Sequence, residues 1–589
     1  MIIEKINIKN FRNLNSLEVD FNKNLNFIVG RNNIGKSNLL KLINKISKAS
    51  NFNEFDFLDI NREIDIRITL KLDDYELGLF DDYFDIQDST KINLNISQQD
   101  PESELVVTEI FSNDEVPVRY LKRINYMYYD SMRKLETRGD ILQGNNDFKV
   151  INHILNKEIA DSDSNLITYS DESERVIERV NKYVRKIQPI RDNNLSISLD
   201  NSKQYEHLKR IARLTTDEGY GIENMGYGAQ YSTMIPLNII NNLISKYRYK
   251  DAFNKMISTD EEGKNYINLI IGIDEPEIHL HPHLQRKSIK YIENILTGRN
   301  EEFNNLIKYL FDGLDYITGQ LIVVTHSPYI ILDDYKNFIR FYKDEGNTKA
   351  ISGINLNNSD SSSISHLMKN MPNLKLCFFS KIVIFVEGDS ELPAIKEFSK
   401  KMKIDLDDCE IEVVSAGSKD TIPILSKMYS DFGINSVSII DRDNGNNKDG
   451  RYIKVNNVFF TDKKDFEEEI LEKMNLLQFF KHSNYVSGKD YNLKGNFIKY
   501  LKNLGWEDRK DKLDLNIENF QSILKEIENN FSGAELKKIK QANHELLYKE
   551  LQKNKSYING YSMSTILESD QIPEIYRRAI MKAKELSID

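Results

Sequence analysis

One eight-residue segment restricts the fold more than any other part of the chain. It reads Gly-Arg-Asn-Asn-Ile-Gly-Lys-Ser, from Gly30 to Ser37, and lies between the apolar stretch LNFIV and the stretch KSNLLKLINKI. Its glycines let the backbone curl so that N–H groups point at phosphate oxygens. A predicted strand before the segment and a predicted helix after it make it a phosphate-binding loop. The alternative is a simple Gly-Asn turn before a helix.

The expected nucleotide-binding residues of this loop are Gly30, Asn33, Gly35, Lys36 and Ser37. Lys36 supplies a positive charge for the outer phosphates, and the Ser37 hydroxyl is a ligand for Mg²⁺. ATP and Mg²⁺ or Mn²⁺ are therefore the expected cofactors.

Two later strand ends are expected to complete this site. In LIIGIDEPE, Asp274 is predicted to contact the shell of the metal, and Glu275 to orient or deprotonate the attacking water. In LIVVTHSPY, His326 is placed to sense the γ-phosphate, although taken alone it is a polar residue at a strand end. His279, His281 and His283 have poor spacing for zinc on a helix, so we interpret them as a solvated loop and helix start.

These motifs resemble the ATP-binding-cassette class of ATPases that includes the SMC, Rad50 and RecF proteins. The opening IKNFRNL is similar to the start of such ATPase heads, and GYGAQYS lies where the class has its signature, which caps the ATP of a second subunit. The resemblance implies this role for Gly228, although the segment departs from the usual Leu-Ser-Gly-Gly form. Gln87 and Gln98 are weak candidates for the glutamine that couples ATP to the lever lobe.

The rest of the chain suggests an α/β protein of two large parts. We expect an ATPase domain over residues 1–345, with a helical insertion at about 134–215 that is too short for a long coiled coil. A linker is expected over 346–378, because INLNNSDSSSIS is polar and poor in apolar residues. Strands and helices then alternate, which predicts parallel βαβ units and a second α/β domain with a helical C-terminal part over 379–589.

Composition limits the class of protein. A hydrophobic fraction of 40% and a charged fraction of 29% are typical of a soluble globular protein, and two cysteines exclude a disulfide framework. No signal peptide or membrane-spanning run is evident, so we expect a cytoplasmic protein with no membrane partner. The net charge of −11 argues against a largely basic surface, but it leaves room for a local basic groove.

Carboxylates gather at the predicted strand ends of the second domain. Glu387 ends the strand in KIVIFVEG, Glu391 follows on the next helix, and Asp441 and Asp443 end the strand in SVSIID. Sites in parallel sheets form where strands end, and converging carboxylates are tolerated only with a cation. Oxygen ligands favour Mg²⁺ or Mn²⁺, and Asp465 with Glu467 is a candidate for a second metal position. Two solvated strand ends and an ordinary acidic helix start are the alternatives.

The pattern Glu-Gly-x-x-Glu followed by Asp-x-Asp resembles the Toprim domain of topoisomerases, primases and certain nucleases. A cassette-type ATPase followed by Toprim resembles the OLD (overcoming lysogenization defect) family, and within it the nuclease subunits of Gabija anti-phage systems. Such a protein is expected to be a metal-dependent DNA endonuclease and a homo-oligomer, dimer or tetramer, with a helicase-like partner. The resemblance implies catalytic roles for Glu387, Asp441 and the late lysine Lys555, with Glu275 in the ATPase.

Three interpretations remain open on the sequence. The first is DNA cutting that the ATPase domain regulates, with ATP either activating or restraining it. The second is an ATP-dependent DNA clamp or scaffold with a Toprim domain that does not cut. The third is a topoisomerase, which needs a nucleophilic tyrosine in a DNA-gate domain.

Overall fold

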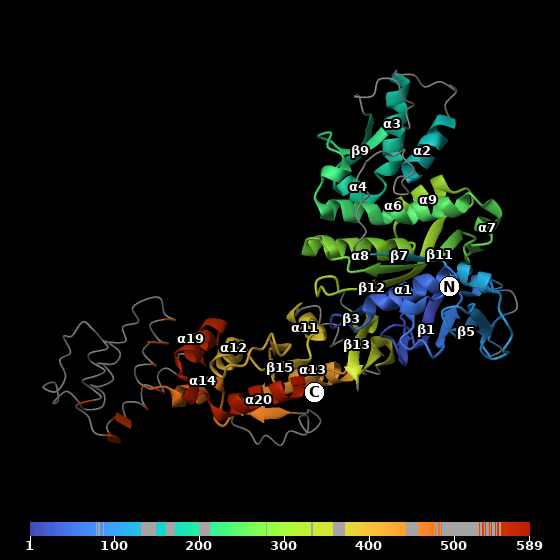
Figure 1. Ribbon diagram of the computed structural model, residues 1–589. Helices are drawn as coiled ribbons and strands as arrows, with labels where there is room; N and C mark the ends of the chain where they lie inside the picture. The colour runs from blue at the N-terminus through green and yellow to red at the C-terminus, as the bar shows by residue number, and fades with distance from the viewer. Residues whose placement is uncertain are drawn as a thin grey trace. The chain divides into compact units, whose positions relative to one another are not determined.

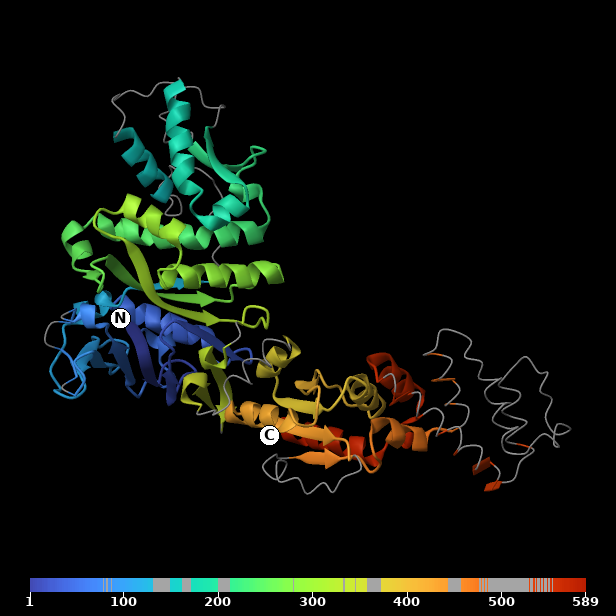
Figure 2. The same ribbon diagram turned by 180° about the vertical axis from the view of Figure 1, so that it is seen from behind.

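The chain forms two compact units, Met1–Pro372 and Asn373–Asp589. Their helices and strands are labelled in Figure 1 and are seen from behind in Figure 2. The computed structural model describes residues 1–77, 79–80, 83–85, 87–130, 149–160, 171–199, 212–278, 280–331, 334–344, 346–356, 372–442, 457–475 and 555–588, and single positions or pairs between 478 and 552. The segment predicted as a linker, 346–378, contains β14 (Asn347–Ser352), which belongs to a sheet of the first unit. Residues 357–371 of that segment lie outside the described part.

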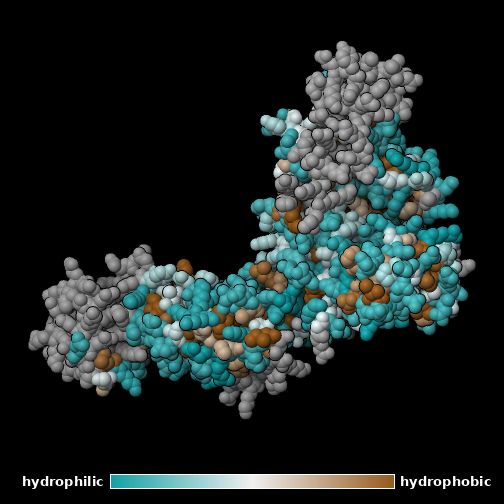
Figure 3. Space-filling model, in the orientation of Figure 1, coloured by the Kyte–Doolittle hydropathy of each residue, from teal (hydrophilic) through white to brown (hydrophobic). Residues whose placement is uncertain are grey.

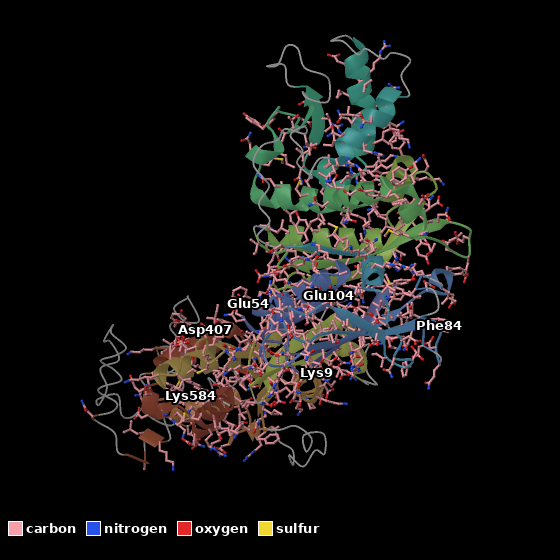
Figure 4. All side chains as sticks on the ribbon, turned by 45° about the vertical axis from the view of Figure 1, so that its right-hand side comes forward. Lys9, Glu54, Phe84, Glu104, Asp407 and Lys584 are labelled. Atoms are coloured by element: carbon pink, nitrogen blue, oxygen red, sulfur yellow. The ribbon has the colours of Figure 1, made fainter. Side chains whose placement is uncertain are left out.

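An antiparallel sheet of five strands begins the first unit, in the order β2-β1-β4-β5-β6. Its strands are β1 (Ile2–Lys9), β2 (Leu17–Asp20), β4 (Ile64–Lys71), β5 (Lys91–Gln98) and β6 (Val106–Glu109). Apolar and polar residues alternate in β4, so one face is buried and the other meets solvent. Lys9, the exposed last residue of β1, pairs with Asp65 on β4 (2.8 Å) and is labelled in Figure 4.

A second sheet of seven strands carries the phosphate-binding loop. Its order is β10-β11-β12-β3-β13-β14, with β7 paired to β11. The strands are β3 (Leu25–Gly30), β7 (Tyr126–Tyr129), β10 (Ile257–Thr259), β11 (Asn265–Asp274), β12 (Tyr316–Val324), β13 (Phe338–Asp344) and β14. Strands β7, β11, β12, β3 and β13 run parallel, so their carboxyl ends meet along one edge.

Helices cover both faces of this sheet. They are α1 (Lys36–Ser47), α6 (Tyr227–Tyr247), α7 (Lys250–Asn254), α8 (Pro282–Leu296) and α9 (Glu301–Leu310). Figure 1 shows α1 on one side, and α8 with α6 beyond it on the other. Alternate residues of β3 serve the two layers, because Phe27 packs into the core under α8 and Ile28 into the core around α1.

The segment predicted as a helical insertion contains helices and a small sheet. Its described elements are α2 (Lys149–Ala160), α3 (Asp171–Val184), α4 (Gln188–Asp192), β8 (Leu195–Leu199) and β9 (Ala212–Thr216). Val176, Val180 and Val184 recur at helical spacing on α3 and are buried. Strands β8 and β9 pair antiparallel, and this small sheet was not predicted.

The second unit is built on a parallel four-stranded sheet of order β16-β15-β17-β18. Its strands are β15 (Ile382–Val386), β16 (Ile411–Ser415), β17 (Asn435–Ile440) and β18 (Val458–Phe460). Its helices are α11 (Pro372–Leu376), α12 (Glu391–Lys401), α13 (Ile422–Asp431), α14 (Phe466–Lys473), α19 (Tyr557–Ile566) and α20 (Glu574–Ile588). The parallel sheet in this domain confirms the α/β fold predicted for it.

The face shown in Figure 3 is largely hydrophilic, with scattered apolar residues. Within the part of the chain that the structure describes, no helix is both long enough and apolar enough to span a bilayer.

Candidate active sites

The backbone of the phosphate-binding loop requires glycine at two positions. Gly30 ends β3 at φ 143°, and a Cβ there would lie 2.4 Å from the Phe341 carbonyl oxygen. Gly35 caps α1 at φ 110°, and a Cβ there would lie 2.4 Å from Leu14 Cδ2. Both conformations and both close approaches exclude a side chain. The loop therefore leads directly into the N-terminus of α1, where backbone N–H groups can bind an anion.

Lys36 lies buried against the loop that it follows. Its Nζ donates to the carbonyl oxygens of Gly30 and Arg31, both at 2.7 Å. Burial lowers the pKa of Lys36 to about 8, while the carboxylates Glu275, Asp274 and Glu277 act to raise it. The ammonium is thus held by the loop and faces the acidic side of the site.

Ser37 and Asp274 come together across two neighbouring elements. The Ser37 hydroxyl donates to Asp274 Oδ1 at 2.9 Å, and the Tyr128 hydroxyl donates to Asp274 Oδ2 at 3.3 Å. Burial raises the pKa of Asp274, and Glu275 adds to the rise, while the bond from Ser37 opposes it. A hydroxyl and a carboxylate in contact beside a phosphate-binding loop fit the ligand set of Mg²⁺.

A cavity of about 610 Å³ joins these parts. Glu275 and His326 lie on its wall, with the His326 Nε2 3.7 Å from Glu275 Oε1. Burial lowers the pKa of His326 to about 4, and Lys36 adds to the effect, so the ring is neutral at pH 7. The cavity is lined by Asn13, Asn32, Asn33, Ile34, Gly35, Lys36, Ser37, Asn38, Glu275 and His326.

Gly228 is not among the residues that line this cavity. It lies in the first turn of α6, which begins at Tyr227 after Gly226. Its predicted role toward the nucleotide of a second subunit stays a prediction. Gln98 is buried in β5 and donates to the Phe52 and Asp100 carbonyl oxygens, both at 2.9 Å, which is a structural role.

The histidines after β11 fall in two groups. His281 and His283 are exposed, and their rings stack with centroids 5.8 Å apart at the start of α8. His279 lies outside the described residues.

In the second unit, adjacent parallel strands bring the predicted carboxylates to one edge. Glu387 follows β15 and Asp441 follows β17, its parallel neighbour. The Asp441 backbone N–H donates to Glu387 Oε2 at 3.4 Å. Glu391 is the first residue of α12, and a Cβ on Gly388 would lie 3.1 Å from its Oε2. Asp443 falls outside the described residues.

These acids perturb one another. Burial raises the pKa of Glu391 to about 7, and Glu467 and Glu387 add to the rise. Burial raises the pKa of Asp441 to about 9, and Glu391 and Glu387 again add to it. Mutual repulsion of this kind is relieved by a bound cation, and oxygen ligands favour Mg²⁺ or Mn²⁺.

Lys555 is held by two of the acids. Its Nζ lies 3.1 Å from Glu467 Oε2 and 3.6 Å from Asp465 Oδ2. Burial lowers the pKa of Lys555, but the carboxylates of Glu467, Asp465 and Asp441 outweigh it, so the net pKa is raised. The ammonium is therefore charged and coupled to the acidic cluster.

Asp465 also has local partners. It caps α14 by accepting from the Glu468 N–H at 3.0 Å, and it accepts from the Tyr548 hydroxyl at 2.8 Å and from Gln552 Nε2. In the described part of the chain, no three His, Cys, Asp or Glu side chains form a group ready to hold a metal ion. The donor types and their repulsion fit a divalent cation, but the described side chains do not make a closed shell.

Two family matches agree with this arrangement. Residues 1–157 and 131–331 match the family described as AAA ATPase domain. Residues 378–443 match the family described as Overcoming lysogenization defect protein-like, TOPRIM domain. The chain belongs to the AAA ATPase domain family and carries an OLD-type Toprim domain. The predicted OLD architecture, an ATPase domain followed by Toprim, is thereby confirmed.

Three curated relatives match parts of the chain. Endonuclease GajA of Bacillus cereus is 22% identical over 493 residues, which cover 67% of this chain and 68% of that protein. Septu protein PtuA of Bacillus thuringiensis is 22% identical over 340 residues, which cover 56% of this chain and 73% of that protein. DNA replication and repair protein RecF of Lactobacillus acidophilus is 46% identical over 43 residues, which cover 7% and 12%.

Solved structures give weaker likenesses. The Smc head bound to the C-winged helix domain of ScpA is 15% identical, covers 60% of this chain and 98% of its own, and has a TM-score of 0.33. The C-terminal region of the Burkholderia pseudomallei OLD protein is 16% identical, covers 36% and 99%, and has a TM-score of 0.23. The strand order of the sheets and the two family matches define the fold.

Sequence reasoning missed several residues of the ATPase site. Asn13 Nδ2 donates to the Asn33 carbonyl oxygen at 3.0 Å, and Asn38 Nδ2 donates to Asn13 Oδ1 at 2.8 Å, so Asn13 ties the chain's opening segment to the loop. Asn13 belongs to IKNFRNL, which was noted only as an opening motif. Glu277 and Tyr128 were also missed, because neither stands in the loop motif or directly after a strand.

Proposed function

We propose that this OLD-type protein is a divalent-metal-dependent DNA endonuclease whose ATPase domain regulates cutting, acting in anti-phage defence. The carboxylates at the ends of β15 and β17 carry the proposal, because the two parallel strands bring Glu387 and Asp441 together, with the Asp441 N–H donating to Glu387 Oε2 at 3.4 Å. Burial raises the pKa of Glu391 and Asp441, and the neighbouring acids add to both rises, which a bound cation would oppose. The relationship to Endonuclease GajA supports the same reaction class. The relationship covers 67% of this chain and 68% of that protein.

Each acid has a proposed part in phosphodiester cutting. Glu387, Glu391 and Asp441, with Asp443, would hold the metal, and Glu467 with Asp465 is the candidate second position. A divalent ion there supplies Lewis-acid stabilisation and a more acidic attacking water. Lys555 lies beside these acids, where an ammonium can stabilise charge that develops on the phosphate.

The ATPase domain would bind ATP between the loop and the ends of β11 and β12. Lys36 would contact the outer phosphates, Ser37 and Asp274 would hold Mg²⁺, and Glu275 would orient the attacking water. Gly228 would complete the site of a second copy, which implies a homo-oligomer. DNA is the proposed substrate, a helicase-like protein the proposed partner, and the cytoplasm the proposed location.

A plasmid assay tests the proposal. Supercoiled plasmid is incubated with the protein and Mg²⁺ or Mn²⁺, with and without ATP, and strand breaks are measured. Glu387→Ala is expected to abolish cutting, and Lys36→Ala to abolish any effect of ATP on it. Asp407→Asn and Lys9→Ala are matched controls, since both side chains are exposed and are labelled in Figure 4.

Three outcomes would contradict the proposal. Absence of cutting under every condition would favour the ATP-dependent clamp or scaffold. Cutting that survives Glu387→Ala would place the reaction elsewhere. Relaxation without strand breaks would favour a topoisomerase.

A further inference from the structure

Glu277 lies in the turn after β11, three residues beyond Asp274, and both of its carboxylate oxygens have partners. Oε2 accepts from the Thr325 hydroxyl at 2.9 Å, and Oε1 accepts from the His326 backbone N–H at 2.5 Å. Both donors belong to the loop after β12. One side chain thus ties the turn after β11 to the backbone that carries His326.

The contact continues into a longer hydrogen-bonded chain. Thr325 Oγ1 accepts from the Ser327 N–H at 2.9 Å, and the Ser327 hydroxyl donates to Gln285 Oε1 at 2.6 Å. Gln285 Nε2 in turn donates to the Leu280 carbonyl oxygen at 2.8 Å. Hydrogen bonds therefore connect the turn after β11, the loop after β12 and the first turns of α8. Figures 1 and 2 show α8 running beside the sheet that contains these strands.

The choice of a carboxylate here is informative. Glu277 lies near Glu275, and the two negative charges repel, as the rise in the pKa of Glu277 through burial and through Glu275 indicates. A glutamine would avoid the repulsion, but with its oxygen on the His326 N–H it would present an NH2 group to Thr325, so the hydrogen bond from the Thr325 hydroxyl to a charged oxygen would be lost. The carboxylate accepts from the hydroxyl and from the backbone N–H with a separate oxygen for each.

The position of the backbone at residue 326 matters for the cavity. The His326 ring lies on the cavity wall with Lys36 and Glu275, the residues expected at the γ-phosphate end. The hydrogen bond from the His326 N–H to Glu277 restrains the backbone at this residue, and so limits the positions that the imidazole ring can take in the cavity. A displacement of about 1 Å is enough to weaken a contact with a phosphate oxygen strongly.

We propose that Glu277 is a positioning residue that holds His326 at the γ-phosphate end of the nucleotide cavity, so that the site distinguishes ATP from ADP. The inference rests on the proposed nucleotide binding by this domain. It adds a role for Glu277: this carboxylate affects recognition of the γ-phosphate by holding the loop after β12, which carries His326.

Nucleotide affinity tests the inference without requiring hydrolysis. Kd values for ATP and ADP, each with Mg²⁺, are measured by calorimetry on the full chain for wild type, Glu277→Gln, His326→Ala and the double variant. The wild type is expected to prefer ATP. Glu277→Gln is expected to lower the ATP-to-ADP preference about ten-fold with the Kd for ADP nearly unchanged, because a hydrogen bond to a charged group is lost.

The double variant separates positioning from an independent effect. If Glu277 acts through His326, Glu277→Gln adds little to His326→Ala. Thr325→Ser, which keeps the hydroxyl, is expected to keep the preference, and Thr325→Val, which removes it, to lose part of it. Melting temperatures show whether each variant is folded, and a Kd for ADP near that of wild type confirms an intact loop.

Several results would overturn the inference. They are an unchanged preference in Glu277→Gln, equal weakening of ATP and ADP, additive effects in the double variant, or a wild type that does not distinguish the nucleotides. Failure of the proposed function gives a different result, because the wild type would then bind neither nucleotide, or would bind both without effect on DNA cutting.

Discussion

Asp56 is fully buried and is surrounded by donors from three parts of the first unit. It accepts from Lys45 Nζ at 2.6 Å, from the Arg12 guanidinium at 2.9 Å and from the Asn53 N–H at 2.9 Å. Burial acts to raise the pKa of Asp56, but these hydrogen bonds outweigh it, so the pKa is lowered. The folded state therefore stabilises the ionised form of Asp56 relative to the unfolded chain.

Replacing Asp56 by Asn is expected to lower the free energy of unfolding of the first unit by about 3 kcal/mol at pH 7, because two cations lose their buried partner. Since the folded pKa lies below the unfolded value of 3.8, the stabilisation is complete above about pH 4 and is lost as the pH falls through the folded pKa. Urea unfolding of wild type and Asp56→Asn at several pH values measures this difference in the free energy of unfolding.

Asp65→Asn is the matched control, because Asp65 pairs with the exposed Lys9 and should contribute at most about 1 kcal/mol. A difference between wild type and Asp56→Asn that stays constant down to pH 3 would contradict the assignment of the lowered pKa.

Lys555→Met should separate metal binding from cutting. Removing the ammonium leaves Glu467 and Asp465 without their cation, so the metal concentration for half-maximal activity should stay the same or fall. The cutting rate should drop about 10²- to 10³-fold, because charge on the phosphate loses its stabilising group. Cutting rates against Mn²⁺ concentration measure both quantities. A higher metal requirement with an unchanged maximal rate would show that Lys555 serves only to shape the site.

Motifs and strand ends made some residues predictable. Lys36, Ser37 and Asp274 lie in motifs with a known order along the chain, and Glu387 and Asp441 each follow an apolar strand, so their chemistry is visible locally. Asp56, Asn13 and Glu277 act through partners far along the chain or on another strand, such as Asp56 with Arg12 and Glu277 with His326. A single sequence contains no signal for such a pairing.

At the scale of elements, Gly560 shows how closely α19 packs against the start of α12. A Cβ at this position would lie 1.7 Å from the Ser390 carbonyl oxygen, one residue before Glu391. Gly→Ala inside a helix ordinarily stabilises by about 1 kcal/mol. Here we expect Gly560→Ala to destabilise the second unit by about 1–3 kcal/mol and to reduce cutting, because α19 must shift away from the acidic cluster.

Urea unfolding and the plasmid assay measure both effects, and Thr565→Ala is the control. Thr565 lies on the exposed side of the same helix, so its replacement should leave cutting unchanged. A more stable Gly560→Ala with full activity would show that α19 does not position this site.

Helices with a regular apolar stripe were easier to anticipate than small sheets. The valines of α3 repeat at helical spacing within one short segment. Strands β8 and β9 have five residues each and pair across residues 200–211, and β14 lies in a segment predicted as a linker. Short strands are stabilised by partners elsewhere in the chain rather than by their own pattern, so sequence periodicity does not reveal them.

At the scale of the whole molecule, substitutions at the two proposed phosphate sites should have separable effects on ATP binding and on cutting. Glu387→Ala is expected to abolish cutting while leaving the Kd for ATP within about two-fold of wild type, because Glu387 belongs to the second unit and the nucleotide cavity is lined by residues of the first. Lys36→Ala should weaken ATP binding and leave metal-dependent cutting without its nucleotide response. Calorimetry and the plasmid assay on the same preparations measure this. A loss of ATP binding in Glu387→Ala would show that the two sites are not independent.

The sequence by itself predicted the candidate residues of both sites and determined the order of the two domains, because a phosphate-binding loop and strand-end carboxylates use residues that are close together in the chain. Only the tertiary structure decided which side chains meet: Ser37 with Asp274, Glu277 with the loop of His326, and Lys555 with Glu467. These pairs join strands and helices that are distant in sequence. Their contacts depend on strand order and helix packing, which local pattern does not encode.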